Sequence, residues 1–130
     1  MADTNALAKE FQTLASKAAA GELIIESGAA DRCAQRCEDY IKDLQGLSER
    51  TRRMVTADSF GNLNSAKALG QKFADLAEGT DGHGSYVEAV RQHIEILTSM
   101  ADMYRKAGTA YRNCDEATQL AIKQQTNKLD

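Results

Sequence analysis

The chain is 130 residues long, contains no Pro and no Trp, and has 21 Ala. A Pro-free chain of this length arises by chance only about once in a thousand at an average Pro usage of about 5%, and all-β sandwiches and barrels, whose turns are rich in Gly and Pro, are nearly excluded. Val, Ile, Leu and Phe make up only 23 residues, but the net charge of −3 is too small for a disordered chain. The composition predicts a helical protein with a thin core built largely from Ala, which favours a protein partner or a homodimer that supplies part of the burial.

Charge and hydropathy exclude several classes of partner. The 16 basic and 19 acidic residues interleave along the chain, so nucleic acid is not an expected partner. The one candidate basic stripe, Arg50, Arg52 and Arg53, falls where a predicted helix ends, and cations are favourable there without any ligand. No run of 18 apolar residues exists, so no membrane span is expected. Residues 1–14 lack the apolar stretch of a Sec signal peptide, so we expect synthesis in the cytoplasm.

Two helices are predicted in the first half of the chain. The first covers residues 4–20, where apolar residues recur every three or four positions. Gly21 is expected to end it. Ser27 is a suitable N-cap for the second, predicted over 28–55. The second keeps a coiled-coil heptad for more than three repeats, through Ala30, Cys33, Cys37, Tyr40, Leu44, Leu47, Thr51 and Met54.

Two more helices are predicted in the second half. A short one covers 63–78, and the segment 79–84 that follows, with three Gly in six residues, is expected to be a flexible loop. The sequence Ser85-x-x-Glu88 is a capping box that begins the longest helix, predicted over 85–125. Two adjacent apolar stripes run along that helix, so it is expected to contact two neighbours, or one neighbour and another chain.

Together these elements predict an all-α fold in one domain, residues 1–130. The helices 28–55 and 85–125 form a long antiparallel hairpin, and the two short helices complete a helical bundle. The 4–20 helix is expected to cover the far half of the last helix, which 28–55 is too short to reach.

The sequence offers no constellation for catalysis. His83 falls in the Gly-rich loop and His93 on the flank of a helix, so neither has the scaffold that a Ser or Cys nucleophile requires of its base. The Gly-rich segment follows a helix rather than a strand, which does not fit a phosphate-binding loop. We therefore expect a non-enzymatic protein without cofactor.

The three cysteines leave two interpretations open. Cys33 and Cys37 lie one helical turn apart, but a metal site needs two more ligands, so no metal is expected and both are interpreted as small buried heptad residues. In an antiparallel hairpin the start of helix 28–55 lies near the end of the last helix, which would bring Cys114 toward Cys33. A Cys33–Cys114 disulfide is thus an alternative to three free thiols.

Two local sequence features lie at the two ends of the predicted hairpin. Phe60 and Gly61 follow the heptad helix, where the ring can pack across the hairpin end while Gly lets the chain reverse. Tyr111 and Asp115, four apart near the end of the last helix, are expected to project from one face as an aromatic and acidic surface. The wider pattern comprises Gly21-Glu-Leu23, Ala30-Asp-Arg-Cys33, Phe60-Gly-Asn-Leu-Asn-Ser65, Ala68-Leu-Gly-Gln-Lys-Phe73 and Gln92-His-Ile94, with Met100 and Tyr111.

These features together resemble the Trp-x-Gly (WXG-like) superfamily of type VII (ESX) secretion substrates of actinobacteria and related Gram-positive bacteria. More narrowly, most of the chain is similar to longer, Trp-less ESX-associated actinobacterial proteins. The resemblance implies that Tyr111 and Asp115 belong to an export signal, and that Phe60 and Gly61 form the hairpin turn in place of Trp-x-Gly.

The resemblance also implies how the protein works. It would be exported by, or associated with, a type VII secretion system and secreted without a Sec signal peptide. Its contacts would be with the secretion ATPase, a cognate helical-hairpin partner or an effector. The alternative is a cytosolic adaptor or chaperone helix bundle that pairs with a larger secreted toxin or effector.

Overall fold

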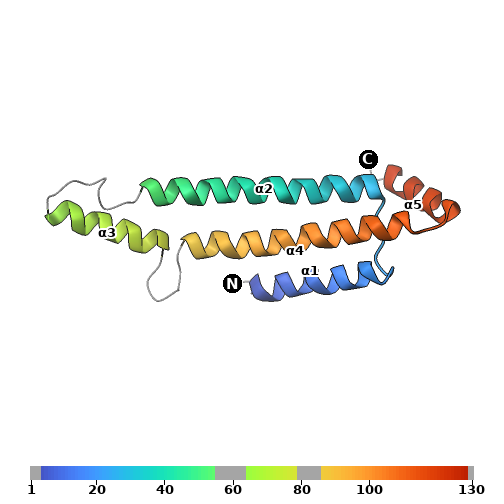
Figure 1. The fold of residues 1–130 in the computed structure, drawn as a ribbon, viewed down its shortest axis with the longest axis horizontal. Helices are drawn as coiled ribbons and strands as arrows, with labels where there is room; N and C mark the ends of the chain where they lie inside the picture. The colour runs from blue at the N-terminus through green and yellow to red at the C-terminus, as the bar shows by residue number, and fades with distance from the viewer. Residues whose placement is uncertain (1–3, 55–63, 79–85, 129–130) are drawn as a thin grey trace. The chain divides into compact units, whose positions relative to one another are not determined.

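A computed structural model describes residues 4–54, 64–78 and 86–128, and every regular element in these ranges is an α-helix. The described helices are α1 (Thr4–Ala19), α2 (Ser27–Met54), α3 (Asn64–Glu78), α4 (Tyr86–Arg112) and α5 (Glu116–Lys128) (Figure 1). The prediction of an all-α helical bundle is confirmed. The predicted turn residues Phe60 and Gly61 and the Gly-rich segment 79–84 lie outside the described residues.

Cα packing divides the chain into two compact units, which we describe separately. Unit 1 comprises residues 1–40 and 95–130, and unit 2 comprises residues 41–94. In unit 2, the later part of α2 and the start of α4 line a common open groove of about 450 Å³. The expectation of a single domain is not tested by this division and stays a prediction.

Helix α1 ends as the sequence predicts. Gly21 has a φ of 80°, a left-handed backbone conformation that residues other than Gly rarely adopt. The Gly21 amide donates to the carbonyl of Ala18 at 3.0 Å, and the Glu22 amide donates to Lys17 at 2.8 Å. These two bonds form the Schellman motif, which satisfies the last carbonyls of the helix.

The start of α2 differs from the prediction, because Glu26 rather than Ser27 caps it. The Glu26 carboxylate accepts hydrogen bonds from the amides of Gly28 at 2.9 Å and Ala29 at 2.8 Å. These backbone bonds lower the pKa of Glu26 from its ordinary value. Four amides at a helix start lack helical partners, and Glu26 satisfies two of them with a charge that also suits the helix dipole.

The cap predicts an acid-sensitive contribution to stability. Because the pKa of Glu26 is lower in the folded state, its stabilisation is fully present above the unfolded pKa of about 4.3 and is lost as the pH falls through the lower folded value. Glu26→Ala is expected to cost about 1 kcal/mol at pH 7. Urea unfolding at pH 7 and pH 3 measures both effects. A variant whose loss of stability between the two pH values equals that of the wild type would show that Glu26 is not the acid-sensitive group.

Small residues bring α2 and α4 close together within unit 1. Ala30, Ala34 and Ala107 are completely buried. A Cβ placed on Gly108 would lie 3.0 Å from the Cβ of Ala30 and 3.7 Å from the Cα of Ser27, so the two backbones approach each other closely here. The contact leaves no room for a larger side chain.

The described core is made mainly of Ala, as the composition predicts. Eight of its thirteen buried apolar residues are Ala, and none of the largest side chains is fully buried. The core residues are Ala8, Ala15, Ala18, Ala30, Ala34, Cys37, Val90, Ile96, Ala101, Met103, Ala107, Ala110 and Tyr111. None of the helices in the described ranges is both long and apolar enough to cross a membrane.

Candidate functional site at the α4–α5 corner

The prediction of one continuous helix over 85–125 is wrong, because the chain turns a corner at residues 113–115. Helix α4 ends at Arg112 and α5 begins at Glu116. The Cys114 amide bonds back to the carbonyl of Tyr111 at 3.0 Å, three residues away, instead of continuing the helical spacing of four. Asp115 then caps α5 by accepting a hydrogen bond from the Thr118 amide at 2.7 Å. An Asp side chain competes with helical hydrogen bonding through such a local contact, which favours a break in the helix at this point.

Gln119 holds the corner from the other side. Its side-chain amide Nε2 lies within hydrogen-bond distance of three carbonyl oxygens, those of Tyr111 at 3.1 Å, Arg112 at 3.2 Å and Cys114 at 3.0 Å. In return the Tyr111 hydroxyl donates to the backbone carbonyl of Gln119 at 3.1 Å. Gln119 thus takes the role of a C-cap for α4, where carbonyls lack helical partners.

The two residues of the candidate export signal lie on opposite sides of the corner. Tyr111 is the last buried residue of α4, 8% exposed, and Asp115 is an exposed cap of α5. Hydrogen bonds from the side chain and the backbone of Thr118 lower the pKa of Asp115, so its carboxylate is charged at neutral pH. The expectation that the pair projects from one helical face is wrong, because residues 113–115 are not helical. Their role in export is a separate matter and stays a proposal.

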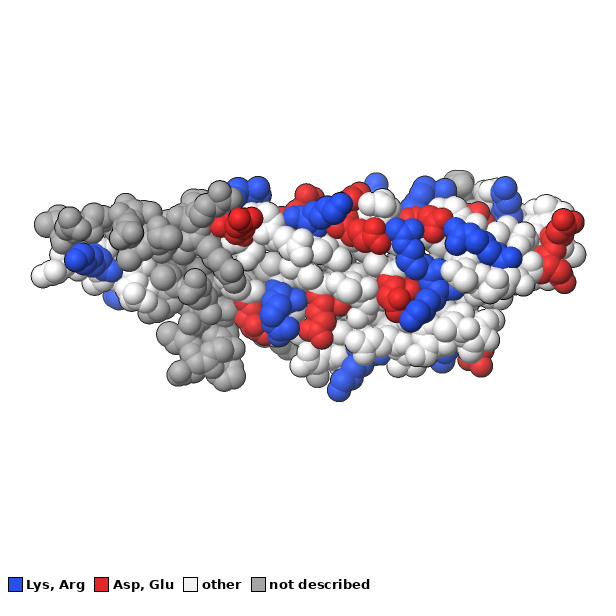
Figure 2. Space-filling model, viewed as in Figure 1, with Lys and Arg blue, Asp and Glu red and all other residues white. Residues whose placement is uncertain are grey.

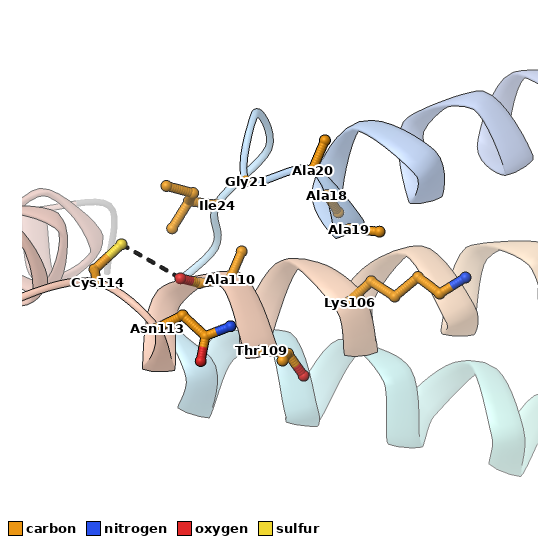
Figure 3. Close-up of a pocket in the computed structure, with 10 residues that line it drawn as sticks. All are labelled: Ala18, Ala19, Ala20, Gly21, Ile24, Lys106, Thr109, Ala110, Asn113 and Cys114. Carbon is orange, nitrogen blue, oxygen red and sulfur yellow. Dashed lines mark hydrogen bonds between the residues drawn. The ribbon is translucent and has the colours of Figure 1, made fainter.

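A surface pocket of about 530 Å³ opens beside the corner (Figure 3). One wall is the end of α1 and the connector that follows it, and the other is the last two turns of α4. The lining residues are Ala18, Ala19, Ala20, Gly21, Ile24, Lys106, Thr109, Ala110, Asn113 and Cys114. The connector is held in place because the Ile25 amide donates to the carbonyl of Ala107 at 3.3 Å. The end of α1 thus lies against the last turns of α4, but the expectation that α2 is too short to reach this part is wrong, because Asp31 of α2 bonds to Arg112 at the end of α4.

The register of α2 against α4 argues against a Cys33–Cys114 disulfide. All three cysteines are free thiols in the structure, and the Cys114 thiol donates to the carbonyl of Ala110. Cys33 and Cys37 lie near Tyr104, whose pKa rises through burial and through these two thiols. Cys33 lies beside Tyr104, whereas Cys114 lies beyond the end of α4 at Arg112. The helix runs about 12 Å from Tyr104 to Arg112, and this length already exceeds the roughly 7 Å of Cα separation that a disulfide spans. Cys114 therefore lies beyond the reach of Cys33.

Ion pairs join α2 and α4 across the surface of unit 1. Arg105 bonds to Asp31 at 3.3 Å and to Glu38 at 3.1 Å, and Arg112 bonds to Asp31 at 2.7 Å. The bond to Glu38 is the main reason that the pKa of Arg105 is raised. Figure 2 shows charges of both signs interspersed over the described part of this face. Such exposed pairs set the register of the two helices more than they stabilise them.

Among the described residues, no group of three or more His, Cys, Asp or Glu side chains is placed to hold a metal. Burial raises the pKa of the Cys37 thiol, which makes it a poor nucleophile. The ring of His93 is engaged within its own helix, with Nδ1 2.8 Å from the carbonyl oxygen of Ala89. His83 and Ser85, the predicted cap, lie outside the described residues, and Glu88 accepts hydrogen bonds from Arg91.

Fold and corner together define an all-α bundle with an antiparallel α2–α4 pair. Comparison with protein-family models, with curated proteins and with solved structures found no match to the chain.

Sequence reasoning missed the two polar residues that shape the ends of these helices. Gln119 and Glu26 carry no motif, because Gln inside a helix and Glu before one are ordinary on the surface of any protein. The Asn113-Cys-Asp115 segment offered the only signal, since Asn and Asp are favoured at caps.

Proposed function

We propose that this protein acts through protein–protein contacts, without catalysis, and that it is exported by, or associated with, a type VII secretion system. The observation that carries the proposal is that Tyr111 lies in the last turn of α4 and Asp115 lies just beyond that helix, near the place where the resembled superfamily has its export motif. A helical partner or the secretion ATPase would bind the corner through the exposed, charged Asp115, which caps α5.

Exposed apolar side chains support a partner-binding role. Helix α5 has no buried residue, and its Leu120 is 59% exposed. Tyr40, Leu47 and Leu69 are also between 40% and 50% exposed. Together with a core of small side chains, this distribution leaves apolar surface for a partner to cover.

The structure permits a sharper export test than deletion of both signal residues. Ser is a good helix cap without charge, so Asp115→Ser is expected to keep α5 folded while removing the carboxylate. If the secretion system recognises the carboxylate, the amount of the Asp115→Ser variant in the culture filtrate falls to that of a cytoplasmic lysis marker. Two controls are expected to be exported normally: Asp115→Glu, which keeps the negative charge, and Asp43→Ser, which removes an exposed acid from a different helix, α2.

Two results would contradict the export proposal. Normal export of Asp115→Ser would remove Asp115 from the signal. Absence of the wild-type protein from the filtrate, together with its co-purification with a larger toxin or effector from cells, would instead establish the alternative of a cytosolic adaptor or chaperone.

A further inference from the structure

The corner between α4 and α5 is held almost entirely by polar contacts. Five donor groups form the hydrogen bonds there: the two N–H groups of the Gln119 side chain, shared among three carbonyls, the Thr118 amide that bonds to Asp115, the Tyr111 hydroxyl and the Cys114 amide. No side chain of α5 is buried. The side chains of α5 themselves therefore contribute little burial, which is the main favourable term of most helix packing.

The sequence across the corner is compatible with a continuous helix. It contains no Pro, and no Gly follows Gly108. The apolar stripe of α4 also continues through the break at helical spacing, as Ala107, Ala110, Cys114, Ala117 and Ala121. A straight helix would replace the bonds of these five donors with about five backbone bonds, from the amides of residues 114–118 to carbonyls four residues earlier. The exchange is nearly balanced in hydrogen bonds.

We infer that the α4–α5 corner is a two-state element, bent in the structure and able to straighten into one helix from Tyr86 to Lys128. Two observations explain why the bent state is the ground state. The Tyr111 hydroxyl bonds to α5, so α5 covers that end of the ring. Lys123 on α5 lies close enough to Glu26, at the start of α2, to help lower the pKa of its carboxyl (Figure 1 shows α5 folded back at this end of α2).

Straightening would change what a partner sees. In the bent state Tyr111 is covered and Asp115 is used as a cap, whereas in a continuous helix the two would lie one turn apart on one face. A partner that binds this pair would draw the corner into the straight state, because ligands shift populations by their differential affinity. This consequence rests on the proposed function, but the two-state corner does not.

The test weakens the corner without touching the rest of the bundle. Asp115→Ala with Gln119→Ala removes the cap and the side-chain bonds of Gln119, and Gln124→Ala changes an exposed glutamine of the same helix as a matched control. NMR Cα chemical shifts of residues 113–115 report directly whether these residues are helical. Nitroxide labels on ketone-bearing residues at Arg36 and Gln125, both exposed, report the distance between α2 and α5.

We expect helical shifts at 113–115 in the double variant, with a new population of label distances longer by on the order of 20 Å, the length that thirteen residues add beyond Arg112. Gln124→Ala should keep the wild-type shifts and distances. Asn113→Ala with Asp115→Ala raises helix propensity at the corner itself and should shift the same signals.

Either of two outcomes would overturn the inference. Residues 113–115 could stay non-helical in both double variants with unchanged label distances, or residues 116–128 could show random-coil shifts, which would mean that α5 detaches and unfolds. Because these measurements use purified protein, they do not depend on whether the export proposal is correct. If the corner does not straighten, the export assay of Asp115→Ser still tests the export proposal independently.

Discussion

Ala30→Leu is expected to be the most damaging single substitution in α2. Ala30 is completely buried, and its Cβ lies 3.0 Å from the place that a Cβ on Gly108 would occupy. Three added carbons cannot be accommodated without moving α2 away from α4. Overpacking of this kind costs about 1–3 kcal/mol and sometimes more, against a total stability of roughly 5–15 kcal/mol for a domain. Guanidinium unfolding followed by circular dichroism measures the loss.

Ala121→Leu is the matched control, because it makes the same chemical change at an exposed position of α5 and should alter stability little. A second pair isolates the contact itself. Gly108→Ala should gain none of its roughly 1 kcal/mol of helix propensity in the wild type, but should gain it when Ala30→Gly removes the opposing Cβ. Equal effects of Gly108→Ala in both backgrounds would show that the two helices do not meet closely at this point.

Sequence periodicity predicted most of the fold because the helices of this chain follow their apolar patterns. The start and end of each helix agree with the predicted bounds to within one residue for α1, α2 and α3. The closing role of Gly21 was also predictable, since the left-handed conformation at a helix end strongly favours Gly. The absence of Pro and the excess of Ala gave the helical class and the character of the core before any position was considered.

The corner could not be predicted from periodicity, because the apolar stripe passes through it without interruption. What ends α4 is a set of polar contacts between residues up to eight positions apart, with Gln119 bonding back to Tyr111. A hydrophobic pattern does not record such contacts, and the propensities of Asn113 and Asp115 lower helix stability by only tenths of a kcal/mol each. The Cys33–Cys114 disulfide could likewise not be judged from the sequence, because it depends on the register of α2 against α4. Close packing of Ala30 on Gly108 and the ion pairs of Arg105 set that register, and it keeps the two cysteines apart.

Gln119 and Tyr111 can be separated by substitution, because each uses a different group. The Gln119 side chain bonds to backbone carbonyls of the corner, while the Tyr111 hydroxyl bonds to the Gln119 backbone, which Gln119→Ala leaves in place. Tyr111→Phe therefore removes one hydrogen bond at a cost of about 1 kcal/mol. The hydrogen exchange of α5 amides should speed up in this variant while that of α1 stays unchanged.

Tyr111→Ala removes the ring as well, and it is expected to cost about 3 kcal/mol. Tyr111 is 8% exposed and is the only aromatic residue among the buried residues of the described core, so few large side chains remain to compensate. The difference between the Ala and Phe variants in guanidinium unfolding gives the contribution of the ring alone. If Tyr111→Ala costs no more than Tyr111→Phe, the ring does not anchor the corner. A loss of export in Tyr111→Phe, which keeps the ring and nearly all the stability, would separate recognition of the hydroxyl from its structural role.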